Sequence, residues 1–388
     1  MRQIKVTRNF LSHKKLHQLT AKIIPEILGR QLIPVLEHVS KQKVVVDLQD
    51  LFTRYTFDFV STIATGFNPN TLCIEFPEIP FAKSMDDACE AIFYRHIIPE
   101  SLWKLQRWLG IGKERKYTDS FKTIDDFAAK HISNRREIIS KLMTRTEEEE
   151  EEESFNVLNL YLSGHEISGA TFTDEKIIRD NLIGITFAGE ETTRTALSWF
   201  FWLISKNPLV EIKIREELRR NLPQKEDKEG RIFFLLDELG NLVYLHAALC
   251  ETLRLFPPVP YEVRTPIHED NLPSGENVNQ NTTVIVSIYA MARMKSIWGE
   301  DCEEFKPERW MTEDGGIKHH PQHKFLAFNA RPRVCPGKDI AFVLMKAIAA
   351  TILHNYHAQV LESHHVIPNL SVTLGMKHGL LAKLEPRE

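Results

Sequence analysis

The feature that most constrains this chain is an uninterrupted helical pattern that begins at Thr173 and ends at the breaker Asn207-Pro208. Thr173 is a favoured N-cap residue, and the acids Asp174 and Glu175 follow in the first turn, where the helix dipole stabilises negative charge. About 33 residues at 1.5 Å each predict a rod of about 50 Å. Its second half is apolar on nearly every side, with Leu197, Trp199, Phe200, Phe201, Trp202, Leu203 and Ile204. A helix of that kind is buried, so we expect the rest of the chain to fold around it.

The other patterns are mostly helical as well. Helical spacing of apolar residues predicts further helices within residues 32–67, 103–111, 121–142, 211–222, 235–255 and 336–355. A β-like segment at 282–288 and an alternating, hairpin-like segment at 366–384 form a smaller part. We therefore predict a mainly α fold with a small β part, in one domain that covers residues 1–388. The seven glutamates at 147–153 repel one another and are interpreted as an acidic surface loop.

Composition excludes several classes of protein. The net charge is −4, so the chain lacks the basic excess that attracts nucleic acid. The five cysteines are scattered without a C-x-x-C pair, which argues against a disulfide framework or a zinc site and favours a reducing, cytosol-facing location. The longest apolar stretch, 196–204, holds nine residues, whereas a membrane span needs about 20. The basic, polar first residues do not resemble a signal peptide.

Cys335 stands just before the last long helix, which Pro336 is expected to open as its first residue. Free backbone N–H groups and the positive end of the helix dipole are expected to lower the pKa of a cysteine at this place, and Arg333 adds positive charge nearby. A thiolate suits an electrophile or a soft metal. From these residues alone, an inert buried cysteine remains the other interpretation.

Polar groups interrupt the long helix at its middle, in the segment Ala-Gly-Glu-Glu-Thr-Thr at 188–193. Acids and hydroxyls in an apolar helix cost free energy unless they have partners. A solvent-facing Glu190-Glu191 pair on an ordinary helix is the alternative.

A third motif places Glu251 and Arg254 three residues apart on one helix face, and Arg309 follows in the segment Phe-Lys-Pro-Glu-Arg-Trp at 305–310. Surface helices often carry such a Glu–Arg pair, so this motif has little weight by itself.

Together, in this order, the three motifs resemble those of the cytochromes P-450, the haem-thiolate monooxygenases. The haem-binding loop of that family runs Phe-x-x-Gly-x-Arg-x-Cys-x-Gly, and Phe328, Arg333, Cys335 and Gly337 match it. The resemblance implies the cytochrome P-450 fold, with haem b as cofactor and Cys335 as the axial ligand of its iron. It also implies that Arg333 pairs with a haem propionate and that Phe328 packs beside the sulfur.

The resemblance assigns roles to the other motifs as well. Glu191 and Thr192 would deliver protons to iron-bound oxygen, and Gly189 would let O₂ approach. Glu251, Arg254 and Arg309 would form a buried network that locks the haem-side core. Arg264 matches a position that often pairs with a propionate.

One position of the loop departs from the family pattern, because Arg331 stands where the family has glycine. That glycine often takes a positive φ, and a non-glycine residue there costs about 1–2 kcal/mol. Two outcomes are open: the loop tolerates Arg331, or Arg331 weakens haem binding.

Stretches such as 93–96, 103–108, 296–299 and 376–380 resemble the plant long-chain branch of the family. This implies hydroxylation of a long-chain alkane or fatty acid, with O₂ and with electrons that an NADPH-dependent cytochrome P-450 reductase supplies, at the cytosolic face of the endoplasmic reticulum membrane. Related members couple phenols in alkaloid synthesis, which is a second hypothesis. Ile185, Phe187 and residues 259–263 are candidates for the pocket wall or for plain core.

Residues 9–13 resemble a segment that lies well inside members of this branch. We therefore expect the membrane anchor, the first helices and strands and one pocket wall to be missing. An inactive or merely haem-binding remnant is the third hypothesis.

Overall fold

The computed structural model describes residues 10–11, 14–142, 155–162, 174–221, 234, 236–280 and 282–387. The acidic run at 147–153 and Thr173 lie outside the described residues. The helices are α2 (Lys14–Ile27), η1 (Leu28–Leu32), α3 (Ile33–Lys41), α4 (Leu48–Thr65), α5 (Pro80–Arg95), α6 (Glu100–Leu109), α7 (Gly112–Leu142), α9 (Val157–Leu162), α10 (Glu175–Lys206), α11 (Pro208–Arg220), α12 (Leu236–Leu239), α13 (Val243–Leu255), α14 (Ile288–Met291), α15 (Lys295–Trp298), η2 (Pro307–Trp310) and α16 (Lys338–Asn355). Each segment expected to be helical contains a helix, whereas α2, α5 and α9 lie outside the expected segments.

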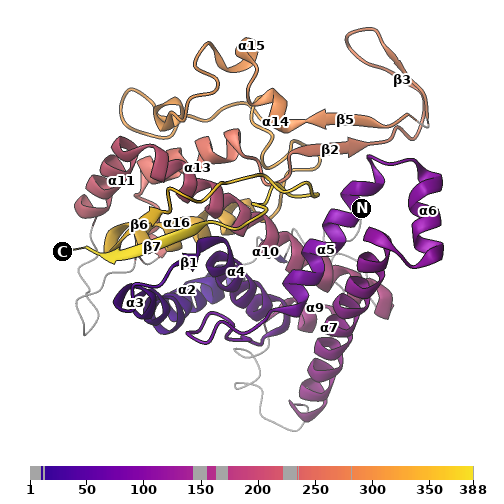
Figure 1. The fold of residues 1–388 in the computed structure, drawn as a ribbon, viewed down its shortest axis with the longest axis horizontal. Coiled ribbons are helices and arrows are strands. Elements are labelled where there is room, and N and C mark those ends of the chain that lie inside the picture. Colours follow the sequence, from indigo (N-terminus) through magenta and orange to yellow (C-terminus); the bar gives the residue numbers. More distant parts are fainter. Residues whose placement is uncertain are drawn as a thin grey trace.

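The long helix is α10, and it lies near the middle of the molecule (Figure 1). Its N-cap is Asp174, whose carboxylate accepts the Lys176 N–H at 2.9 Å. Asn207 ends α10, because Pro208 begins the next helix, α11. The apolar second half is buried as predicted, against α4, α13 and α16.

The β part is small and antiparallel. It contains β1 (Val46–Asp47), β2 (Tyr261–Arg264), β3 (Asp270–Asn271), β4 (Asn277–Val278), β5 (Val284–Ser287), β6 (Tyr356–Val360) and β7 (Leu381–Pro386). The strand expected at 282–288 is confirmed by β5, which pairs with β2. The hairpin expected at 366–384 is only partly correct: Pro368 and Met376 form a single bridge, whereas β7 pairs with β6 and β1. Sequence alternation identifies a strand but does not identify its partner.

Two clusters of apolar side chains organise the fold. The larger one joins α2, α4, α10, α13 and α16. The smaller one ties α5 and α7 to α4, on the right of Figure 1, through Phe57, Phe81, Met85, Ala88, Cys89 and Ile124. The predicted mainly α fold with a small β part is confirmed.

Candidate active site

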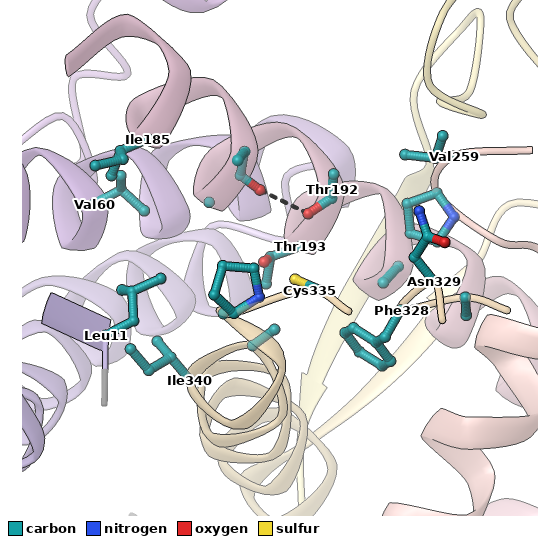
Figure 2. Close-up of a pocket in the computed structure, with 18 of the residues that line it drawn as sticks. Leu11, Val60, Ile185, Thr192, Thr193, Val259, Phe328, Asn329, Cys335 and Ile340 are labelled. Atoms are coloured by element: carbon teal, nitrogen blue, oxygen red, sulfur yellow. Dashed lines mark hydrogen bonds between the residues drawn. The ribbon is translucent and has the colours of Figure 1, made fainter. Parts of the chain in front are cut away.

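A cavity of about 470 Å³ lies between α10, α4, the start of α16 and the loop at 326–337. Its walls are mostly apolar, with Leu11, Val60, Ile185, Ala188, Leu253, Val259, Ile340 and Leu344. Figure 2 shows the Cys335 sulfur on one side of this cavity and Thr192 and Thr193 of α10 on the side above it. Two of the three sequence motifs therefore meet at one apolar space.

Cys335 is held by the loop that precedes α16. Its N–H donates to the Phe328 carbonyl at 2.9 Å. The helix begins at Lys338 with Gly337 as its N-cap, so the expectation that Pro336 is the first helical residue is wrong. The backbone N–H groups of Gly337 and Lys338 do lower the pKa of the thiol, as expected from a helix start. Burial outweighs them, so the net pKa of Cys335 is raised, contrary to the prediction. A cation above the sulfur would be needed to favour the thiolate.

The backbone strain that a non-glycine residue at 331 could cause is absent. The residue of this loop with a positive φ, 60°, is Asn329, and Arg331 does not share that conformation. Asparagine tolerates left-handed backbone better than most residues. The Asn329 amide donates to Glu262 of β2 at 2.9 Å, which anchors the bend. Arg331 is exposed, and its N–H donates to the Gln322 side chain at 3.2 Å. The bend therefore needs no glycine at position 331.

The other residues of the loop motif also border the cavity. Phe328, Arg333 and Gly337 line it. The Phe328 ring packs on Phe342 of α16 with ring centroids 5.3 Å apart, so it joins the loop to the helix. A Cβ at Gly337 would lie 3.9 Å from the Cys335 sulfur, an ordinary contact distance.

Thr192 faces the cavity from α10, and its hydroxyl donates to the Ala188 carbonyl at 2.7 Å (Figure 2). Gly189 lines the same wall of the cavity. Close packing of α10 on α4 also requires a glycine at this position, because a Cβ there would lie 2.6 Å from Val60 Cγ2. The glycine thus permits close approach of two helices as well as access to the cavity.

Glu191 does not line the cavity. Its carboxylate is buried and accepts hydrogen bonds from Arg194 and from the Thr373 hydroxyl. Burial by itself would raise the pKa of Glu191, but Arg194 and these hydrogen bonds outweigh burial and hold the pKa below its ordinary value. The alternative of a solvent-facing glutamate pair is wrong, because Glu190 and Glu191 are both buried.

The third motif forms one buried network beneath the site. Glu251 accepts two bonds from Arg254, each 2.8 Å, and one from Arg309 at 3.2 Å. Trp310 Nε1 and the Lys306 N–H also donate to Glu251, at 2.8 and 3.1 Å. Every oxygen of the buried carboxylate is thus matched by donors. The network joins α13 to η2.

Two of the expected site residues lie elsewhere. Arg264 is exposed on β2 and pairs with Glu262 at 2.5 Å, and it is not on the cavity wall. Phe187 packs on the smaller apolar cluster near α5 and α7, whereas Ile185 and Val259 do line the cavity. A two-residue step along a helix turns a side chain by about 200°, which places Ile185 and Phe187 on nearly opposite faces of α10.

Sequence reasoning missed three residues around Glu191: Asp86, Arg194 and Thr373. The spacing of Glu190 and Arg194, four residues apart in an apolar helix, was a usable signal for a buried ion pair. No local pattern marks Asp86 or Thr373, because they reach the cluster from α5 and from the loop before β7.

A cysteine on the wall of an apolar cavity, opposite a central helix, is an arrangement that suits a haem held by a cysteine thiolate. A family model described as cytochrome P450 matches residues 2–383. The chain belongs to the cytochrome P450 family.

Several curated proteins resemble the chain over most of its length. Alkane hydroxylase MAH1 of Arabidopsis thaliana is 42% identical over 91% of this chain and 68% of its own length. Cytochrome P450 86B1 of Arabidopsis thaliana is 41% identical over 95% of this chain and 66% of its own length. Noroxomaritidine synthase of Narcissus aff. pseudonarcissus MK-2014 is 36% identical over 99% of this chain and 73% of its own length.

The family is one of haem-thiolate oxidoreductases, and the residues present suit that cofactor. The cavity volume lies within the range of about 300–1,000 Å³ that is usual for cofactor and ligand sites. Small apolar residues line both sides of the cavity, Ala188 and Gly189 on α10 and Ala341 on α16, which leaves room for a flat ring. Arg333 lies on the rim of the same cavity and is exposed, a place that suits a carboxylate.

Proposed function

We propose that this chain is a haem-dependent monooxygenase that hydroxylates a lipophilic substrate, a long-chain alkane or fatty acid, with O₂ and NADPH-derived electrons. The observation that carries the proposal is the Cys335 sulfur on the wall of an apolar cavity, across from Thr192. In this proposal Cys335 is the axial ligand of the haem iron and Arg333 binds a propionate. Arg264 remains a candidate for the second propionate contact, because its partner Glu262 lines the cavity although Arg264 itself does not.

The bound haem supplies the activation of O₂. The chain's own residues exclude water and hold protons. The apolar walls keep bulk water from the reacting centre. The Thr192 hydroxyl, now bonded to the Ala188 carbonyl, would turn toward the cavity and donate a proton there. Glu191, one residue earlier, would return a proton to Thr192 through water.

The apolar lining supports an alkyl substrate. Ile185 and Val259 offer contact surface to a hydrocarbon chain without donors or acceptors. The name of one relative, alkane hydroxylase, agrees with such a substrate. A phenol-coupling reaction is the second candidate, supported by the similarity to noroxomaritidine synthase. Comparing the spectral shift induced by a long alkane, by a fatty acid and by a diphenol would separate the three substrate classes.

The first experiment is the absorption spectrum of the reduced, CO-treated protein, for the unchanged chain and for Cys335→Ser. A red-shifted Soret band that the substitution abolishes is expected. Cys73→Ser is the matched control, because Cys73 is a second incompletely buried thiol that does not line the cavity. Absence of the band from folded, unchanged protein would overturn the proposal and favour an inactive remnant.

The redox partner proposed is an NADPH-dependent cytochrome P-450 reductase, and we also propose association with the endoplasmic reticulum membrane. No helix in the described part of the chain is both long and apolar enough to cross a bilayer. However, α6 turns its apolar stripe outward, with Leu102, Leu105 and Leu109 exposed and Trp108 81% exposed. Lys104 and Arg107 flank the stripe. This pattern suits a helix that lies in a lipid interface.

Co-sedimentation with anionic liposomes tests the membrane surface. Trp108→Ser combined with Leu105→Ser is expected to reduce binding. Leu209→Ser serves as the control, because Leu209 is 74% exposed but lies on α11. Equal binding of all variants would rule out α6 as the contact.

A further inference from the structure

The cavity wall next to the loop at 326–337 includes an acid. Glu262 of β2 lines the cavity, together with Asn329 and Arg333 of the loop. Both oxygens of Glu262 have partners: Asn329 Nδ2 donates to Oε1 at 2.9 Å, and Arg264 Nη1 pairs with Oε2 at 2.5 Å. The Glu262 side chain is 24% exposed, so most of it is withdrawn from solvent. Glu262 is therefore an anion that is fixed between the loop and its own strand.

The charges on this wall do not match those of the haem that the family binds. Haem b carries two propionate groups, and a carboxylate that is withdrawn from water needs a cation as its partner. Among the described residues that line the cavity, Arg333 is the one with a positive charge, whereas Asp180 and Glu262 have carboxyl groups. One propionate can therefore pair with Arg333. Within the described chain, a cation for the other has to come from behind the cavity wall.

Arg264 is placed to be that cation. It follows Glu262 by two residues on β2, and side chains at this spacing point to the same face of a strand, about 7 Å apart. The Arg264 side chain is 48% exposed, and its guanidinium also donates to the Val263 carbonyl at 2.9 Å. An ion pair of such exposure contributes little to stability. The Arg264 guanidinium can therefore change its partner without disturbing the fold.

We propose that Glu262 competes with a haem propionate for Arg264 and thereby limits the affinity of this chain for haem. In the structure, Glu262 holds Arg264 outside the cavity. For a propionate to bind Arg264, the guanidinium has to leave Glu262, which keeps its bond to Asn329. One ion pair is then lost for the one that forms, and two carboxylates come close together, which is unfavourable. Glu262 is a positioning residue, because it acts on haem through Arg264.

The equilibrium partition of haem b between this chain and apomyoglobin tests the competition without any turnover. Glu262→Gln removes the negative charge, while the amide oxygen can still accept the bond from Asn329. We expect this variant to bind haem on the order of tenfold more tightly, because a charge-assisted bond to Arg264 becomes available. Glu269→Gln is the matched control, because Glu269 is an exposed acid that does not line the cavity. An unchanged partition in Glu262→Gln would overturn the proposal.

A double-mutant cycle with Arg264→Gln shows whether Arg264 is the group for which the two carboxylates compete. In the Glu262→Gln background, Arg264→Gln is expected to weaken haem binding by about tenfold, because Arg264 is there free to bind the propionate. In the unchanged chain the same substitution should have a smaller effect, because the bond to the propionate only replaces the bond to Glu262. Equal effects in the two backgrounds would show that Glu262 does not restrain Arg264, contrary to the proposal.

Haem b dimethyl ester separates an effect on the propionates from a general effect on the cavity. Its esterified propionates carry no charge and cannot form an ion pair with a guanidinium. The tighter binding by Glu262→Gln is expected with haem b and should vanish with the dimethyl ester. A gain of equal size with both compounds would sink the proposal, because Glu262 would then act on the cavity in another way. Affinity is the readout throughout, so the result does not depend on whether the chain turns over a substrate.

Discussion

At the scale of single residues, Gly189 gives the sharpest prediction about packing. An alanine Cβ there would meet Val60 Cγ2 at 2.6 Å, and a valine in a helix has little rotamer freedom with which to move away. We expect Gly189→Ala to lower the free energy of unfolding by about 1–3 kcal/mol, as overpacking usually does. Denaturant titration followed by circular dichroism measures the change.

Gly184 is the matched control, because it lies on the same helix and nothing is within 4 Å of its virtual Cβ. Gly184→Ala should stabilise the chain by about 0.5–1 kcal/mol through helix propensity alone. Adding Val60→Ala to Gly189→Ala should recover part of the loss. Equal effects of the two glycine substitutions would show that contact with Val60 is not the cause.

Some properties of single residues could be predicted from the sequence, and others could not. The match of Phe328, Arg333 and Cys335 to the haem-binding loop of the family predicted a common site, and the three residues do line one cavity. The pKa of Cys335 could not be predicted, because burial outweighs the helix-start effect, and burial depends on residues far along the chain. The conformation of Arg331 could not be predicted for a related reason: the left-handed residue of the loop is Asn329, whose bond to Glu262 comes from a distant strand.

At the scale of elements, Glu251 joins α13 to η2, and its removal should be costly. Glu251→Gln would place an amide N–H₂ against the donors Arg254, Arg309 and Trp310. Breaking a buried, hydrogen-bonded ion pair typically costs about 3–5 kcal/mol. Glu300→Gln is the control, because the Glu300–Lys295 pair is on the surface, where such pairs contribute about 0–1 kcal/mol. Thermal unfolding of the two variants should differ clearly, and similar melting temperatures would contradict the role given to Glu251.

Elements with strong periodicity were the most predictable. The bounds of α10 differ from the prediction only at its start, where Asp174 is the N-cap. Pairing between distant strands was not predictable, since β7 bonds to β6 and to β1, which lies more than 300 residues earlier along the chain. The buried cluster around Arg194 is predictable only in part. Glu190 and Arg194 are four residues apart on one helix, so their contact can be expected from the sequence, whereas Asp86 reaches Arg194 from α5 through the packing of the fold.

At the scale of the whole molecule, His246 should make folding sensitive to acid. Burial, with smaller contributions from Lys346, Lys338 and His319, lowers the pKa of His246 to about 3 from an ordinary 6.5. Between those two pH values the unfolded chain binds a proton that the folded chain does not. The free energy of unfolding therefore falls as pH decreases from 6.5 toward 3, by at most about 1.4 kcal/mol per pH unit from this group. His246→Phe keeps a ring against Phe342, 4.3 Å away, and removes the titration. Denaturant titrations of both chains should give parallel curves above pH 6.5 and a shallower acid slope for the variant; identical slopes below pH 6.5 would mean that His246 is solvated before the chain unfolds.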